Sequence, residues 1–130
     1  LDPEPLLLTA AVLTWTAGFD VIYSCQDYDF DVKNGLFSVP QRLGIRKALF
    51  VARLLHVVTV ICLLSMAWVF ELNVLYLIGV SLVAIILLYE HTLVSPDDLS
   101  KVNLAFFTTN GIISVVYLLF TVGDVLVTSW

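Results

Sequence analysis

Long runs of apolar residues, separated by short polar segments, make up almost the whole of this chain. Each run has about 20 residues, the length at which an α-helix crosses the hydrocarbon core of a bilayer. A helix this apolar has no side left to face water, so the runs predict membrane spans. The expected spans are residues 6–26, 47–70, 73–91 and 102–127. We therefore predict an all-α, multi-pass transmembrane helical bundle.

Turn-forming residues mark the ends of these spans. The sequence DPEP at positions 2–5 stops any helix before the first span. Residues 71–73 leave room only for a tight turn, so the second and third spans are expected to form an antiparallel hairpin. The sequence SPDD at positions 95–98 ends the third span.

Composition agrees with a membrane location. Hydrophobic residues make up 60% of the chain and charged residues 13%, whereas a soluble domain carries about a quarter charged residues. The net charge of −5 and the lack of a basic run argue against a nucleic-acid partner. Cys25 and Cys62 stand in apolar surroundings, which predicts small packing residues and neither a disulfide nor a metal site.

Six basic residues set the expected orientation. They lie in the segments after the first and third spans, or just inside the adjoining helix ends: Lys33, Arg42, Arg46, Lys47, Arg53 and Lys101. Positively charged loops stay in the cytoplasm, so these segments are expected on the cytoplasmic side of a bacterial inner membrane. The C-terminus is then expected outside, with Trp68 and Trp130 at the outer boundary, where aromatic residues concentrate.

The longest polar interruption, residues 18–44, contains four of the eleven acidic residues: Asp20, Asp27, Asp29 and Asp31. If the first helix continues through it at about 100° per residue, Asp20, Tyr23, Asp27 and Asp31 lie within roughly 80° of one another. Asp29 then points to the opposite side. Ionisable groups at a membrane helix are a functional hypothesis by default.

The spacing of Asp27 and Asp31 places their carboxylates on adjacent helical turns, where they repel unless a cation lies between them. Hard oxygen ligands suit Mg²⁺ together with water and phosphate oxygens. An EF-hand calcium loop is excluded, because Val32 stands where that loop needs glycine and Ser38 where it needs glutamate. A solvated helix end, with its acids paired to basic residues of the loop, is the alternative that spacing leaves open.

A longer pattern extends from these aspartates along the chain. It comprises DVIY at 20–23, QDYDFD at 26–31, Gly35, SVPQRLG at 38–44, EHTLVSPDDL at 90–99 and NLAFF at 103–107. This pattern resembles the second aspartate-rich motif and the following helices of the UbiA superfamily of intramembrane aromatic prenyltransferases. The resemblance is to the bacterial 4-hydroxybenzoate polyprenyltransferase branch and covers essentially the whole chain.

The resemblance implies a fold and a set of ligands. In this family two aspartate-rich motifs face each other at the cytoplasmic end of a central cavity and hold Mg²⁺ against the diphosphate of an isoprenoid donor. By resemblance, Asp27 and Asp31 are metal ligands, and Asp20 is a third acidic group of the same motif. The implied partners are polyprenyl diphosphate, an aromatic acid and the lipid bilayer.

Three further residues are candidates for substrate binding. Tyr23 lies on the acidic stripe and can donate a hydrogen bond to a carboxylate or to the substrate, or simply pack. Lys33 and Arg42 can neutralise diphosphate oxygens, although basic residues of a cytoplasmic loop need no such role.

The first aspartate-rich motif of the family is missing. We therefore expect residues 1–130 to be the C-terminal portion of one prenyltransferase domain, the last four helices of a UbiA-type fold, with the N-terminal half absent. The fragment alone is expected to be inactive.

Two classes of function remain on sequence grounds. The first is an enzyme that transfers a polyprenyl group, with Mg²⁺, to a 4-hydroxybenzoate-type acceptor in ubiquinone biosynthesis, or to a menaquinone-type or other aromatic acceptor. The second is a non-enzymatic, four-helix membrane protein that binds divalent cations. A carrier would place its acids near the bilayer midplane, so their position at one helix end favours the enzyme.

For the remaining polar residues and for Gly111, the sequence favours structural roles over catalytic ones. His56 is expected to be a packed or hydrogen-bonded helix residue with no partner at metal-binding spacing. Glu90-His91 and Asp97-Asp98 are interpreted as a solvated loop, with a cap over the cavity as the alternative. Gly111, beside Asn110, is expected to let helices approach closely.

Overall fold

The computed structural model describes residues 2–129. Within that range, four helices carry segments long and apolar enough to cross a membrane. They are α1 (Pro3–Ser24), α4 (Ile45–Val69), α5 (Val74–Thr92) and α6 (Asn110–Ser129). The predicted all-α bundle of four spans is confirmed, with most ends within a few residues of those expected. The expected interfacial position of Trp130 lies outside the described residues.

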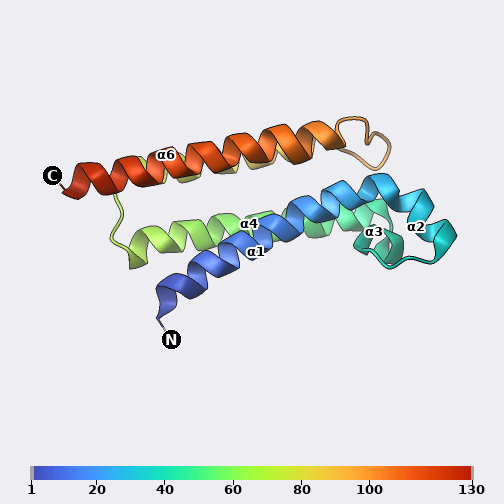
Figure 1. The fold of residues 1–130 in the computed structure, drawn as a ribbon, viewed down its shortest axis with the longest axis horizontal. Helices are drawn as coiled ribbons and strands as arrows, with labels where there is room; N and C mark the ends of the chain where they lie inside the picture. Colours follow the sequence, from blue (N-terminus) through green and yellow to red (C-terminus); the bar gives the residue numbers. More distant parts are fainter. Residues whose placement is uncertain (1, 130) are drawn as a thin grey trace.

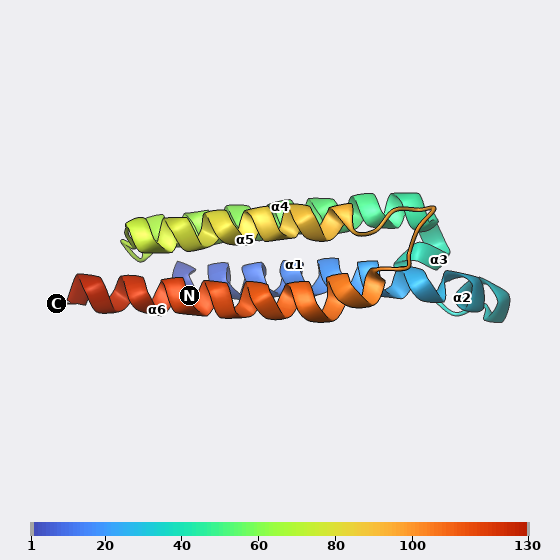
Figure 2. The ribbon, with the colours of Figure 1, turned by 90° about the horizontal axis from the view of Figure 1, so that it is seen from above.

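Neighbouring helices of the bundle run antiparallel (Figure 1). The helices form two pairs, because α1 packs mainly along α4 and α5 mainly along α6. Seen from the perpendicular direction, α4 and α5 lie on one side of the molecule and α1 and α6 on the other (Figure 2). The predicted hairpin of α4 and α5 is confirmed. The connection between α1 and α4 and the connection between α5 and α6 lie at the same end of the bundle.

Three short helical elements fill the connection between α1 and α4: the 3₁₀ turn η1 (Cys25–Asp27), α2 (Tyr28–Asn34) and α3 (Val39–Leu43). Gly35 ends α2 because its φ of 65° lies in the left-handed region that glycine adopts without steric cost. Ser38 begins α3 by accepting a hydrogen bond at its side chain from the backbone N–H of Gln41, at 3.1 Å. The aspartate-rich segment is therefore a folded helical appendage and not a loose loop.

The outward faces of the long helices are apolar. They expose large hydrophobic side chains, among them Leu13, Leu88 and Leu119, and Trp68 is 88% exposed near the end of α4. A water-soluble protein rarely exposes so much contiguous apolar surface, whereas lipid solvates such a surface well. The faces that meet inside the bundle form two apolar clusters, one toward each end. As predicted for packing residues, Cys25 lies in the cluster next to the aspartate-rich segment and Cys62 packs against the other cluster; neither forms a disulfide.

Close helix approach occurs at Gly18 and not at Gly111. A Cβ atom at Gly18 would meet the imidazole ring of His56, so α1 can approach α4 here only because glycine has no side chain. A Cβ at Gly111 would meet nothing within 4 Å. The sequence prediction for Gly111 is therefore wrong: Gly111 faces outward, and its neighbour Asn110 is the buried member of the pair.

Asp124 of α6 accepts hydrogen bonds from backbone N–H groups at the start of the neighbouring helix α5. Its carboxylate is 1% exposed and accepts hydrogen bonds from the backbone N–H groups of Asn73, at 3.0 Å, and Tyr76, at 3.2 Å. The first N–H groups of a helix have no partner within the helix, and the helix dipole favours a negative charge at this end. Asp124 therefore holds the α4–α5 turn against α6.

Replacing Gly18 with alanine is expected to destabilise the protein by roughly 1–3 kcal/mol, the usual cost of overpacking a core. The matched substitution Gly111→Ala is expected to be neutral or stabilising by up to about 1 kcal/mol, since alanine is the better helix former. Unfolding of both variants in the same detergent micelles measures the difference. Equal stability of the two variants would contradict the packing of Gly18 on His56.

Replacing Asp124 with alanine is expected to cost about 2 kcal/mol of unfolding free energy, because hydrogen bonds to a charged group contribute roughly 1.5–3 kcal/mol. Asp124→Asn keeps one acceptor oxygen and is expected to cost less. Denaturant titration of both variants in micelles measures the order of stability. An alanine variant as stable as the wild type would show that the cap contributes nothing.

Candidate functional site

The aspartates of the predicted motif lie where α1 leaves the bundle. Asp20 is near the end of α1, Asp27 ends the 3₁₀ turn, and Asp31 lies in α2. Asp20, Asp27 and Asp29 are exposed and Asp31 is half-buried. The helix is not continuous here, because a 3₁₀ turn advances about 120° per residue instead of 100°. Over three residues this rotates Asp27 and Asp31 by roughly 60° relative to Asp20 and Tyr23.

Asp27 and Asp31 remain four residues apart across the first turn of α2. Within the described residues neither carboxylate has a hydrogen-bond or ion-pair partner. The alternative in which basic residues of the loop pair with these acids is therefore not the arrangement seen. Two oxygen-donor groups one turn apart, open to solvent and not otherwise engaged, fit the oxygen ligands that Mg²⁺ prefers.

Tyr23 is part of an aromatic cluster between α1 and the start of the last helix. Its ring centroid lies 4.4 Å from that of Phe106 and 6.1 Å from that of Phe107. Phe19 contacts Phe106 edge-on at 5.1 Å. Phe106 and Phe107 come from the π-helical segment η2 (Leu104–Thr109), which leads into α6. The aromatic faces thus gather about one helical turn from the aspartates.

The two basic candidates lie at the surface of the same appendage. Lys33 is in the last turn of α2 and Arg42 in the last turn of α3, and both are exposed. The Arg42 guanidinium carbon lies 5.9 Å from the centroid of the Phe37 ring, within the range of a cation–π interaction. Their predicted contact with a diphosphate stays a prediction.

Glu90-His91 and Asp97-Asp98 received one common interpretation from the sequence, but the structure places them in different environments. Asp97 and Asp98 are exposed, as expected for a solvated loop. The Ser100 hydroxyl, at 2.6 Å, and then its backbone N–H, at 3.0 Å, donate hydrogen bonds that hold the pKa of Asp98 below its usual value. Asp98 therefore organises this loop. Glu90, in contrast, lies within α5 and is 0% exposed, so its interpretation as part of a solvated loop is wrong.

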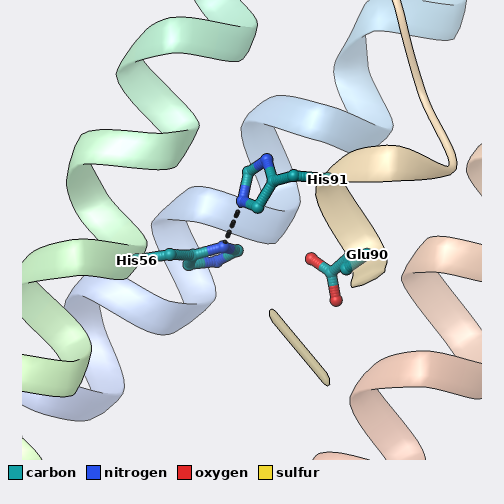
Figure 3. Close-up of side chains that lie close together, drawn as sticks. All are labelled: His56, Glu90 and His91. Carbon is teal, nitrogen blue, oxygen red and sulfur yellow. Dashed lines mark hydrogen bonds between the residues drawn. The ribbon is translucent and has the colours of Figure 1, made fainter. Parts of the chain in front are cut away.

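Glu90 belongs to a group of three metal-ligand side chains that was not expected from the sequence. His56 of α4 and Glu90 and His91 of α5 place one ligand atom each within 4.8 Å of one another. Figure 3 shows the three side chains converging from the two helices. The expectation that His56 has no partner at metal-binding distance is therefore wrong. No other group of three such ligand atoms is found in the described part of the chain.

The predicted α4–α5 hairpin could have indicated that His56 and His91 lie close together. An antiparallel hairpin brings together residues at similar distances before and after its turn, and His56 and His91 satisfy that condition. Spacing along one helix could not show it, because 35 residues separate the two histidines.

Comparison with known proteins gives a consistent family. Residues 1–112 match the UbiA prenyltransferase family. A 4-hydroxybenzoate octaprenyltransferase of Edwardsiella ictaluri (strain 93-146) is 32% identical over 115 residues, covering 86% of this chain and 39% of the relative. The protein of the same name from Tolumonas auensis is 30% identical over 106 residues, covering 82% of this chain and 37% of the relative.

A third relative of that name, from Ectopseudomonas mendocina (strain ymp), is 33% identical over 91 residues, covering 70% of this chain and 30% of the relative. The chain thus spans less than two fifths of the length of these curated relatives. No solved structure matches it. The matched region includes the whole aspartate-rich segment and three of the four long helices, and the chain belongs to the UbiA prenyltransferase family.

Proposed function

We propose that this chain provides the C-terminal part of an enzyme that transfers a polyprenyl group from polyprenyl diphosphate to an aromatic acid of the 4-hydroxybenzoate type, in ubiquinone biosynthesis. One observation carries the proposal: a segment with two unengaged carboxylates, Asp27 and Asp31, lies at one end of membrane helices within the matched region. The names of the similar proteins favour 4-hydroxybenzoate over a menaquinone-type acceptor. They also favour a transferase over a non-enzymatic cation-binding protein.

The donor's diphosphate requires a cation in this site. Carboxylates repel phosphate oxygens, so Asp27 and Asp31 would hold the donor through Mg²⁺ and not directly. Held by these residues, Mg²⁺ would supply positive charge against the departing diphosphate. Asp20, near the end of α1, adds a third negative charge at the same end of the bundle. Lys33 and Arg42 belong to the same appendage as the aspartates. Their positive charges neutralise the remaining negative charge of the diphosphate.

The aromatic cluster is suited to stabilise the allylic carbon of the donor from which the diphosphate departs. Loss of diphosphate leaves positive charge on an allylic carbon, and the faces of aromatic rings attract cations. Tyr23 and Phe106 present such faces about one turn from the aspartates. Once the bond between this carbon and the diphosphate oxygen has broken, the acceptor ring attacks the carbon to form a carbon–carbon bond, and the ring then loses its proton to water or to the released diphosphate.

If the end of the bundle that carries the aspartate-rich segment faces the cytoplasm, a water-soluble aromatic acid can reach the site from there. The segments that hold most of the basic residues lie together at one end of the bundle (Figure 1), and positively charged loops remain cytoplasmic. We accordingly propose that the aspartate-rich segment faces the cytoplasm of a bacterial inner membrane.

Asp27→Asn and Asp31→Asn are each expected to lower prenyl transfer by at least about 100-fold in the complete enzyme, since metal stabilisation of the leaving group contributes several kcal/mol. Asp29→Asn removes the same charge from the same segment and is expected to have a much smaller effect. Transfer from polyprenyl diphosphate to labelled 4-hydroxybenzoate in membrane vesicles measures this. Near-normal turnover in both Asp27 and Asp31 variants would remove these residues from the mechanism.

Chelation of divalent cations is expected to abolish transfer, and added Mg²⁺ is expected to restore it. Asp31→Asn should raise the Mg²⁺ concentration required for half-maximal rate, because one of two oxygen ligands loses its charge. A Mg²⁺ titration of the wild type, Asp31→Asn and Asp29→Asn distinguishes metal binding from a general loss of structure. An unchanged Mg²⁺ requirement in Asp31→Asn would contradict the ligand assignment.

A further inference from the structure

Glu90 is a buried carboxylate with no partner among the described residues. Its side chain is fully buried, and neither carboxylate oxygen has a hydrogen-bond partner. Burying an unpaired carboxylate is strongly unfavourable, so such groups are normally paired with a cation or hydrogen-bonded. Two potential metal ligands lie close by, since ring nitrogens of His56 and His91 are within 4.8 Å of a Glu90 oxygen (Figure 3).

His56 is oriented with one nitrogen already engaged. Its Nε2 lies 3.2 Å from the backbone carbonyl oxygen of Trp15, and a carbonyl can only accept, so Nε2 carries the proton. The lone pair is therefore on Nδ1, which lies 2.7 Å from Nε2 of His91. A histidine that donates its other N–H to a backbone carbonyl is the usual arrangement of a metal ligand. The ring packs on Gly18, where no larger residue fits, so its position is fixed.

The cluster also has an entrance. An open pocket of about 600 Å³ lies between α4 and α5, and His56 and His91 are part of its lining. His91 is half-buried, so its ring can adjust on the pocket side. Arg53 lines the same pocket, and its positive charge opposes a bound cation there, whereas Glu90 supplies the compensating negative charge.

We propose that His56, Glu90 and His91 form a binding site for a divalent transition metal, with Zn²⁺ as the best fit. Two imidazole nitrogens and one carboxylate oxygen are a donor set that Zn²⁺ binds with a fourth position left for water. Mg²⁺ prefers oxygen ligands alone, so this site differs in chemistry from the aspartate-rich segment. The metal takes the place of the hydrogen bond between the two histidines: the proton on Nε2 of His91 moves to Nδ1 of the same ring, and Glu90 supplies negative charge to the ion.

The three ligand atoms, which lie within 4.8 Å of one another, must rearrange to accommodate the ion: the Glu90 oxygen approaches the two nitrogens, and the nitrogens move apart. Tetrahedral coordination at Zn–N distances of about 2.0–2.1 Å separates the two nitrogens by roughly 3.3 Å. The nitrogens must therefore part by about 0.6 Å from their hydrogen-bonded distance of 2.7 Å, which a small rotation of the His91 ring provides. The site joins α4 of one helix pair to α5 of the other, so the bound metal clamps the two pairs together.

Cobalt titration of the purified protein tests the proposal, because tetrahedral Co²⁺ absorbs visible light and Zn²⁺ displaces it. Chelator-treated wild type in lipid nanodiscs is expected to show the visible absorption of one equivalent of tetrahedral Co²⁺ and to unfold at a higher temperature with Zn²⁺ than without. Glu90→Gln and His91→Asn are each expected to weaken Co²⁺ binding by more than about 100-fold, since loss of an outer-shell partner alone costs about 10- to 100-fold.

Two control variants show where the metal binds and whether the protein stays folded. The double variant Asp27→Asn/Asp31→Asn is expected to keep the cobalt spectrum, which excludes binding at the aspartate-rich segment. Metal-free Glu90→Gln is expected to be at least as stable as metal-free wild type, because an amide costs less to bury than an unpaired carboxylate. Absence of saturable Co²⁺ binding in the wild type would overturn the proposal, as would wild-type affinity in either Glu90→Gln or His91→Asn.

Discussion

Hydrocarbon offers no hydrogen-bond partners, so each polar group inside a membrane protein must find its partner within the protein. This requirement accounts for the polar contacts between the helices. The hydroxyls of Thr14 and Thr59 meet at 2.8 Å between α1 and α4, and the indole N–H of Trp15 donates to Asn110 at 3.2 Å. Among the described residues the exceptions are the hydroxyl of Thr121 and Glu90, whose two buried carboxylate oxygens both lack a partner.

The spans and the hairpin were predictable because they follow from local properties of the chain. Length and apolarity define a membrane helix, and a short polar break defines a turn. The same is true of the family, since a long contiguous motif carries it. Interactions between helices were not predictable in this way. Gly111 and Gly18 look alike in the sequence, and only the rotation of each helix decides that Gly18 is the one packed against a neighbour.

The candidate site shows the same division between local and non-local information. The spacing of Asp27 and Asp31 is a local property and survives in the structure, because Asp27 is the N-cap of α2 and Asp31 lies in the first turn of that helix. Their rotation relative to Asp20 was not predicted, since no residue pattern announces the 3₁₀ turn at residues 25–27. The group of His56, Glu90 and His91 depends on two helices and on the depth of Glu90, neither of which a linear pattern records.

The arrangement of the bundle as two pairs has a consequence for how it assembles. Each pair consists of successive membrane helices, α1 with α4 and α5 with α6 (Figure 2). A pair of successive helices can form as soon as both have entered the membrane, without waiting for the rest of the chain. The contact between Trp15 of α1 and Asn110 of α6 joins helices of different pairs that are far apart in the chain, so it can form only after α6 has entered. The order of synthesis thus leaves this polar contact to form after the contacts between successive helices.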